Sequence, residues 1–410
     1  MSDLASTVTR SFEHAYGVST PYSIGVEEEF QLVDPHTFEL VPAADELLDR
    51  ADESERANIK HELMRSVLEI ATPICRNSAD ARDQLLRLRA RVSQLAAASG
   101  CRFASAGTHP FSLYEAQEIT DEARYRDLLT RLKWIAQREL IFGLHVHVGM
   151  DSPDKAMYVF NHIRSYLPEL LALSANSPFW QGRDTGLSSA RSKVFDSFPR
   201  SGIPPTFDDW DSWESLMRRA MNAGAIEDYT YVWWDVRPHP RFGTIEVRVC
   251  DAQTRVEDSL ALAALIQGTA AWLGNEFDEG RPPAHHPAFL INENKWNAAR
   301  YGLDGELIDL ATDTRRPTRD AIEQLIQLAE PHATALGSAH DFVHLRAMLT
   351  STGSTRQREW LADEGTLAHV GRMLADESED VVSAAAISCT AGCSSCQQAA
   401  ATCSPPSGTS

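Results

Sequence analysis

Three short segments of the chain place ionisable side chains two residues apart, within runs that also carry apolar residues at alternate positions. The pairs are Glu27 and Glu29, His145 and His147, and Glu246 and Arg248. Side chains alternate between the two faces of a strand, so each ionisable pair shares one face and its aliphatic neighbours share the other. Placed in one sheet, the segments would form a polar surface rich in carboxylates. Such a surface needs cations, because carboxylates on one face repel one another.

The residue types indicate which cation is expected. Oxygen-rich sites with few histidines suit Mg²⁺ or Mn²⁺, which in turn bind nucleotide phosphates. The spacing of His145 and His147 also fits half of a zinc site, but the body of the chain has no further cluster of histidine and cysteine. Any one segment alone could be an ordinary half-exposed antiparallel strand. The three together favour a metal–nucleotide site, and the absence of a Gly-Lys-Ser/Thr motif excludes the P-loop kind.

Alternating helical and strand-like patterns surround these residues. Short alternating runs predict strands at 23–33, 103–106, 144–150, 231–236 and 244–251. Leucine and alanine spacing predicts helices at 78–99, 158–173 (bent or restarted near Pro168), 260–273, 317–349 and 360–374. Elements of both kinds without strict β-α-β order favour an α+β fold built on an antiparallel sheet.

Bulk composition limits the partners. The chain has 410 residues and a formal net charge of −20, which disfavours nucleic acid and anionic membranes as partners. No secretory signal is visible in residues 1–17, and the most apolar stretch, 261–273, is too short to span a bilayer, so a cytoplasmic protein is expected. Three single cysteines in the body give no disulfide framework, and strand alternation would place Cys250 on the face of Glu246.

Eight motifs in one order resemble a known family. They are Gly-Val-Glu-Glu-Glu-Phe-Gln-Leu-Val-Asp at 25–34, His-Glu-Leu-Met at 61–64, Leu-Glu-Ile-Ala-Thr at 68–72, Gly-Thr-His-Pro at 107–110, Gly-Leu-His-Val-His-Val-Gly at 143–149, Ala-Asn-Ser-Pro-Phe-Trp at 175–180, Trp-Asp-Val-Arg-Pro-His-Pro at 234–240 and Gly-Thr-Ile-Glu-Val-Arg at 243–248. This series resembles the type 2 glutamate–cysteine ligases, also called carboxylate–amine ligases, over roughly residues 20–375.

The resemblance implies a glutamine-synthetase-like fold, in which the concave face of a curved antiparallel sheet with flanking helices holds ATP, metal ions and substrate. The metal ligands it implies are Glu27, Glu29, Glu62, Glu69, His147 and Glu246. It assigns catalysis to Glu246 and Arg248, with Arg248 stabilising phosphate. It assigns substrate carboxylates to Tyr125 and Arg126, with Arg237 as a further candidate. The seven-residue gap between Glu62 and Glu69 does not fix a common face, so Glu62 could instead be a carboxylate on a helix surface.

Two further segments carry arginine and lysine side chains that could bind an anion. The polar, glycine-containing stretch 181–193 holds Arg183, Arg191 and Lys193, and it could fold over phosphate as a lid or remain a solvated surface loop. The segment 294–302 resembles a family segment and offers Lys295 or Arg300 to substrate or phosphate.

The resemblance implies an ATP-dependent ligase with Mg²⁺ or Mn²⁺, joining glutamate to cysteine or a related amine through an acyl phosphate. The expected organisation is an extension at 1–20, a catalytic domain at 21–378 and a disordered tail at 379–410, rich in cysteine, serine and alanine. Two alternatives remain: a ligase acting on a peptide or on its own tail, and a catalytically silent scaffold. The amine is not identified, and homo-oligomerisation stays open.

Overall fold

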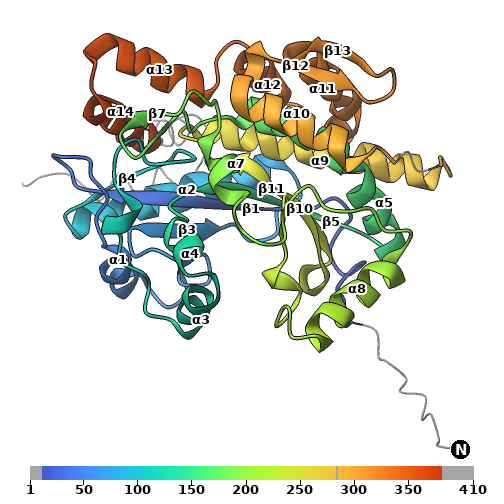
Figure 1. The fold of residues 1–410 in the computed structure, drawn as a ribbon, viewed down its shortest axis with the longest axis horizontal. Helices are drawn as coiled ribbons and strands as arrows, with labels where there is room; N and C mark the ends of the chain where they lie inside the picture. The colour runs from blue at the N-terminus through green and yellow to red at the C-terminus, as the bar shows by residue number, and fades with distance from the viewer. Residues whose placement is uncertain (1–11, 283–284, 381–410) are drawn as a thin grey trace, which may run out of the picture.

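A seven-stranded antiparallel sheet forms the centre of the molecule (Figure 1). The computed structural model describes residues 12–282 and 285–380. The strand order is β10-β11-β5-β1-β3-β2, and β4 pairs with the far end of β1. The strands are β1 (Ile24–Val33), β2 (Ile59–His61), β3 (Val67–Ala71), β4 (Arg102–Ala104), β5 (Gly143–Gly149), β10 (Val236–His239) and β11 (Thr244–Asp251). The predicted α+β class and antiparallel sheet are confirmed.

Helices cover one face of this sheet and bury its aliphatic side chains. They are α2 (Ser78–Ala98), α5 (Pro153–Ile163), α6 (Leu167–Ser174) and α9 (Val256–Asp278). Val26, Val146 and Val247, from three neighbouring strands, are completely buried in this core. Each such side chain contributes roughly 1.5–3 kcal/mol through burial. The opposite strand face is thereby left to the polar residues.

The remaining elements form outer layers. Above α9 in Figure 1 lie α10 (Ala288–Tyr301), α11 (Thr318–Ala335), α12 (Asp341–Met348), α13 (Gly353–Glu364), α14 (Leu367–Glu379) and the hairpin of β12 (Glu306–Asp309) and β13 (Thr314–Pro317). Below the sheet lie α1 (Ala44–Arg50), α3 (Ala123–Leu132), α4 (Trp134–Gln137) and α8 (Trp210–Asn222). The short elements are α7 (Ala190–Phe195), β6 (Phe179–Trp180), β7 (Arg183–Asp184), β8 (Ser201–Gly202) and β9 (Trp233–Trp234).

Three predicted elements are interrupted in the structure. The helix expected at 317–349 is two helices, with Gly337 at φ +87° in the turn between them, and that at 360–374 is divided by Gly365 at φ +72°. Both glycines adopt the left-handed conformation that ends helices. The single strand expected at 231–236 is wrong, because the chain changes partners at Asp235. Before it, β9 pairs with β8, and after it β10 pairs with β11.

The two ends of the chain are described only in part. Phe12 packs on Trp213, and Tyr16 is buried in the core, so residues 12–20 of the expected extension pack on the domain. The tail predicted at 379–410 lies outside the described residues except for its first two positions. None of the helices described is long and apolar enough to cross a membrane.

One acidic residue of β1 points into the core. Glu28 shares the face of Val26 and Phe30, and both it and Arg89 of α2 are completely buried. Arg89 donates from Nε to Glu28 Oε2 at 2.8 Å and from Nη2 to Oε1 at 2.6 Å. Its Nη1 also donates to the carbonyl of Thr254 at 2.8 Å. This pair ties α2 to the strand that carries Glu27 and Glu29.

His109, from the Gly-Thr-His-Pro motif, is a structural residue held in its neutral form. Its Nε2 lies 2.9 Å from the carbonyl oxygen of Phe38, and its Nδ1 lies 2.9 Å from the backbone nitrogen of Ser112. The ring therefore donates at one nitrogen and accepts at the other, which an imidazolium cannot do. Burial lowers the pKa of His109 to about 4, against the opposing bond to Phe38.

We expect the stability of the protein to fall below pH 6.5 partly because of His109. Its pKa is lower in the folded chain than the ~6.5 of an unfolded chain, so its contribution is complete above pH 6.5 and is lost as pH falls towards 4. At pH 5 this loss amounts to about 2 kcal/mol. Urea denaturation at pH 7.5 and pH 5 measures it, and His109→Asn should lose correspondingly less between the two pH values. An equal loss in both proteins would contradict this assignment.

Candidate active site

Strand register brings the three ionisable pairs onto one surface. In β1 and β5, Glu27 lies opposite His145, and in β5 and β11, His147 lies opposite Glu246. On the other side of β1, Glu29 lies opposite Glu69 of β3. The segments that alternation alone could not place are therefore neighbours in one sheet, and their polar faces form one surface.

The ligand atoms on this surface fall into two groups, each with atoms within 4.8 Å of one another. They are Glu27, His145 and Glu246 in the first group and Glu29, Glu62 and Glu69 in the second. Three such ligands each, mostly carboxylate oxygens, suit a pair of hard divalent cations. All five carboxylates of the expected metal set belong to one group or the other.

The histidine in the first group is His145, whereas the sequence analysis expected His147. His147 is held by a 2.9 Å bond between its Nδ1 and the hydroxyl of Thr244, and its ring packs on His239 and Phe242. Its Nε2 lies 3.4 Å from Glu27 Oε1. His147 is thus placed to orient Glu27 from beside the group. Both histidines share one strand face, so strand alternation alone could not distinguish them.

Glu62 does not lie on a helix, so the alternative hypothesis of a carboxylate on a helix surface is wrong. It follows β2 directly and lines the cavity together with Glu69 of β3. Its Oε2 accepts a hydrogen bond from the backbone of Leu63 at 2.6 Å, which fixes the carboxylate.

The electrostatics of the two groups are opposite. Burial and repulsion by Glu62 raise the pKa of Glu29 to about 7, and burial and Glu27 raise that of Glu69 well above its usual range. Burial would also raise the pKa of Glu246, but Arg237 and Arg248 hold it well below its usual range. A cation bound among these three carboxylates would favour their ionisation.

A β-bulge in β11 contradicts one prediction from the sequence. The pairing of β11 with β5 shifts between Val247 and Cys250, so Cys250 lies opposite Leu144 and is buried in the core. It does not share the face of Glu246, because the extra residue reverses the alternation. Arg248 stays on the site face and contacts Glu246 Oε1, while Arg237 donates from Nε to Oε2 at 2.5 Å.

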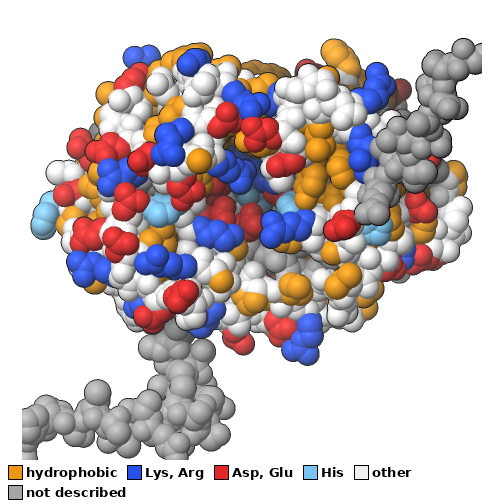
Figure 2. Space-filling model, turned by 90° about the horizontal axis from the view of Figure 1, so that it is seen from below, with side chains coloured by type: hydrophobic (Ala, Val, Ile, Leu, Met, Phe, Trp, Pro, Cys, Tyr) orange, Lys and Arg blue, Asp and Glu red, His pale blue; other side chains and the backbone are white. Residues whose placement is uncertain are grey.

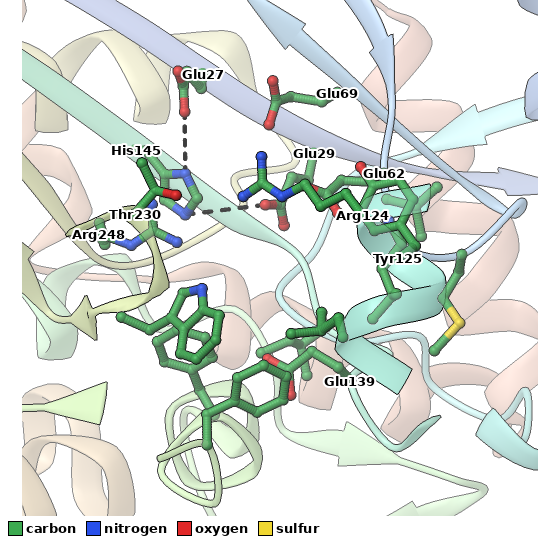
Figure 3. A pocket seen from close by; sticks show the side chains of 18 of the residues that line it. Glu27, Glu29, Glu62, Glu69, Arg124, Tyr125, Glu139, His145, Thr230 and Arg248 are labelled. Atoms are coloured by element: carbon green, nitrogen blue, oxygen red, sulfur yellow. Dashed lines mark hydrogen bonds and ion pairs between the residues drawn. The ribbon is translucent and has the colours of Figure 1, made fainter. Parts of the chain in front are cut away.

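Most of the ligand residues and both arginines line a cavity of about 250 Å³ on the side of the sheet away from α9: Glu27, Glu29, Glu62, Glu69, His145, Arg237 and Arg248. In Figure 2 the surface is hollowed near its centre, where acidic and basic side chains gather. Figure 3 shows Glu27, Glu29 and His145 from one side of the cavity and Glu139 from another. Lining residues that the sequence analysis did not single out include Arg124, Glu139, Thr230, Tyr231 and Trp233.

Comparison with known proteins assigns the family. A model described as glutamate-cysteine ligase family 2 matches residues 23–383, which is most of the chain. The chain belongs to this family. A Rubrobacter xylanophilus protein named "Putative glutamate--cysteine ligase 2-1" is 43% identical over 350 residues, covering 85% of this chain and 93% of that protein. Another from that organism, with the number 2-3, is 44% identical and covers 89% and 99%.

Two solved ligase structures share the fold. A glutamate–cysteine ligase from Francisella tularensis in complex with AMP has a TM-score of 0.67 at 13% identity, covering 88% of this chain and 89% of that chain. A bifunctional glutathione synthetase from Pasteurella multocida has a TM-score of 0.64 at 14% identity, covering 87% and 52%. The predicted glutamine-synthetase-like fold is confirmed by these likenesses and by the antiparallel sheet.

Three of the expected substrate-binding residues of this family 2 protein line the cavity: Tyr125, Arg191 and Arg237. Arg126 does not, because its place on α3 directs it to solvent, where it pairs with Asp121. Arg124, two residues earlier, lines the cavity instead. A helix turns about 100° per residue, so Arg124 and Arg126 lie on nearly opposite sides of α3, and only the packing of α3 shows which side faces the cavity.

The other arginine and lysine residues predicted to bind substrate or phosphate lie outside the cavity. Arg183 is exposed in β7, and Lys193 pairs with Asp196. Lys295 is buried in ion pairs of 2.8 and 2.7 Å with Asp196 and Asp235. None of these three lines the cavity. The lid interpretation fails for Arg191, which is buried in α7 and donates to backbone carbonyls of β11.

Replacement of Gly143 by alanine is expected to lower kcat about 10²-fold, as ångström-scale displacement of catalytic groups does. A Cβ there would lie 2.5 Å from Arg191 Nη2 and 2.7 Å from His145 Nε2, and the Gly143 N–H donates to Glu29 at 2.6 Å. Steady-state kinetics measures the loss. Gly25→Ala is the control, because its Cβ would meet His147 at an ordinary 3.7 Å. Equal activity of the two variants would contradict the role given to Gly143.

Proposed function

We propose that this protein is an ATP-dependent ligase that joins the γ-carboxylate of glutamate to an amine, with Mg²⁺ or Mn²⁺ bound on the polar face of the sheet. The observation that carries the proposal is the pair of adjacent ligand groups beside Arg237 and Arg248 in one cavity. Family membership supports glutamate as the substrate that becomes activated.

Each ligand group is proposed to hold one cation. Glu27, His145 and Glu246 would hold one cation, and Glu29, Glu62 and Glu69 would hold the other. When bound, the cations would neutralise phosphate charge and polarise the transferring phosphoryl group. His147 keeps Glu27 in place through their 3.4 Å contact. We therefore propose His145 as the metal ligand and His147 as a positioning residue.

The reaction is proposed to proceed in two steps. A γ-carboxylate oxygen of glutamate attacks the γ-phosphorus of ATP, the bond to the bridging oxygen breaks, and ADP leaves. The amine then attacks the carbonyl carbon of the γ-glutamyl phosphate and expels phosphate, and the amine proton passes to solvent. Arg248 stabilises the phosphoryl group during transfer, because its fixed charge already lies in the cavity. Arg237 holds Glu246 from its other side.

Cysteine is the acceptor that the family name suggests, and a related small amine is the alternative. Acceptor pockets for similar amines differ by one or two side chains. The cavity lining includes apolar and aromatic residues, Leu128, Ile141, Phe195 and Phe198, which could contact the side chain of the acceptor.

ATP turnover by the purified protein tests the proposal. The protein is incubated with MgATP, glutamate and a panel of amines that includes cysteine, and ADP and product mass are both recorded. The proposal predicts ADP formation that needs glutamate, one amine and the divalent metal, with a product equal to the summed masses less water. A folded protein that turns over no amine would favour a scaffold instead.

A further inference from the structure

Arg191 and Glu139 line the same cavity without pairing with each other. No ion pair within 4.0 Å joins them among the described residues. Burial raises the pKa of Glu139 to about 8, and Arg191 is the cation that most opposes this rise, so the two side chains lie within electrostatic range. A ligand that places a positive group beside Glu139 and a negative group beside Arg191 would ionise the carboxyl group and pair with the guanidinium.

Each of the two side chains has an enclosed polar atom without a hydrogen-bond partner. Arg191 is 4% exposed and donates from Nη1 and Nη2 to the carbonyls of Val249 and Arg248 at 3.3 and 3.2 Å, but its Nε has no partner. Glu139 Oε2 is likewise enclosed and has no partner. A buried polar atom without a partner costs stability, and perturbed groups of this kind gather at functional sites.

The chemistry of the pair selects the ligand. A nucleotide phosphate would meet Arg191 favourably but would bring no positive charge to Glu139. A simple amine would satisfy Glu139 and leave Arg191 Nε unmet. A free α-amino acid carries an ammonium and a carboxylate on one carbon, and it satisfies both side chains at once.

We propose that Glu139 and Arg191 together bind the ammonium and carboxylate groups of a free α-amino acid. The inference rests on the proposed function and adds a specificity determinant to it. Arg191 Nη2 lies beside the position of Gly143, next to His145 Nε2, so the head group would be held a short distance from the proposed metal ligands. Glu139 also interacts electrostatically with Glu29 and Glu62.

Two substrates of the proposed reaction could supply this head group: the α-carbon end of glutamate, or an amino acid that serves as the acceptor. Both offer the same zwitterion, and each makes a different prediction. If glutamate is held there, a donor without the amino group should be rejected because of Glu139. If the acceptor is held there, an acceptor that is not an amino acid should be bound without help from Glu139, and an amino-acid acceptor should depend on it.

The variant Glu139→Gln tests the inference, with Glu359→Gln of the exposed face of α13 as its matched control. Glutamate and glutarate, which lacks the amino group, are compared as donors, with hydroxylamine as the acceptor because it is uncharged at neutral pH. Cysteine and hydroxylamine are then compared as acceptors. Calorimetric binding of glutamate and of cysteine is measured in parallel, since it needs no turnover.

We expect either the donor preference or the acceptor preference to fall by about 10- to 100-fold in Glu139→Gln. Neither preference should change in Glu359→Gln. Loss of the preference for glutamate over glutarate identifies the donor as the ligand. A KM for cysteine raised by that factor, with the KM for hydroxylamine unchanged, identifies the acceptor. Unchanged preferences together with unchanged calorimetric affinities would overturn the inference. A wild type that binds these amino acids but forms no hydroxamate would instead contradict the proposed function.

Discussion

Replacement of Arg248 by alanine is expected to lower kcat about 10²–10³-fold with the fold intact, as removal of one fixed transition-state donor does. The Arg248 side chain is only 12% exposed, lines the cavity and contacts Glu246. Glu246 keeps Arg237 as a partner in the variant, so the buried carboxylate is not left without a cation. Steady-state kinetics with saturating MgATP and glutamate measures the effect.

The matched control for this prediction is Arg126→Ala. Arg126 is the exposed arginine of α3 that pairs with Asp121 and does not line the cavity. Its replacement should change kcat by no more than about twofold, the scale of ordinary surface substitutions. A 10²-fold loss in the Arg126 variant, or near-normal activity in the Arg248 variant, would contradict the site as described here.

Arg89→Met is expected to lower the free energy of unfolding by about 3–5 kcal/mol, the usual cost of leaving one buried ionic partner alone. The variant leaves the carboxylate of Glu28 without a cation in the core, with only the hydroxyl of Ser259 against it. It also removes the donors to the carbonyls of Gln253 and Thr254. Urea denaturation at neutral pH measures the change.

The double variant Glu28→Leu with Arg89→Met is the control for this effect. Replacing both members of a buried pair by apolar residues is often close to neutral. The double variant should therefore regain a large part of the lost stability, although the two carbonyls remain without their donor. If the double variant is as unstable as Arg89→Met alone, the cost does not come from the isolated charge of Glu28.

Strand alternation was sufficient to predict which faces carry chemistry. It placed Glu27 and Glu29, His145 and His147, and Glu246 on polar faces, and the sheet brings these faces together. The signal is strong because an aliphatic face must be buried and a one-residue slip would expose it. The antiparallel α+β class followed from the same short alternating runs.

Other features depend on information that local sequence does not contain. The choice of His145 over His147 in the first ligand group rests on how each ring is held in the folded site, where Thr244 bonds His147, and the burial of Cys250 rests on a bulge in β11. The pairing of Glu28 with Arg89 joins residues 61 positions apart. Glu139 precedes β5 without a recognisable motif, so only the folded cavity reveals it.

The transfer of oxygen from glutamate to phosphate tests the central proposal most directly. Glutamate labelled with ¹⁸O in its γ-carboxylate is turned over with MgATP and the acceptor amine, and the products are analysed by mass spectrometry. The acyl-phosphate route predicts one ¹⁸O atom in each molecule of inorganic phosphate, because the carboxylate oxygen that attacks phosphorus leaves with it. Label in AMP, or amide formation without label in phosphate, would contradict the proposed mechanism.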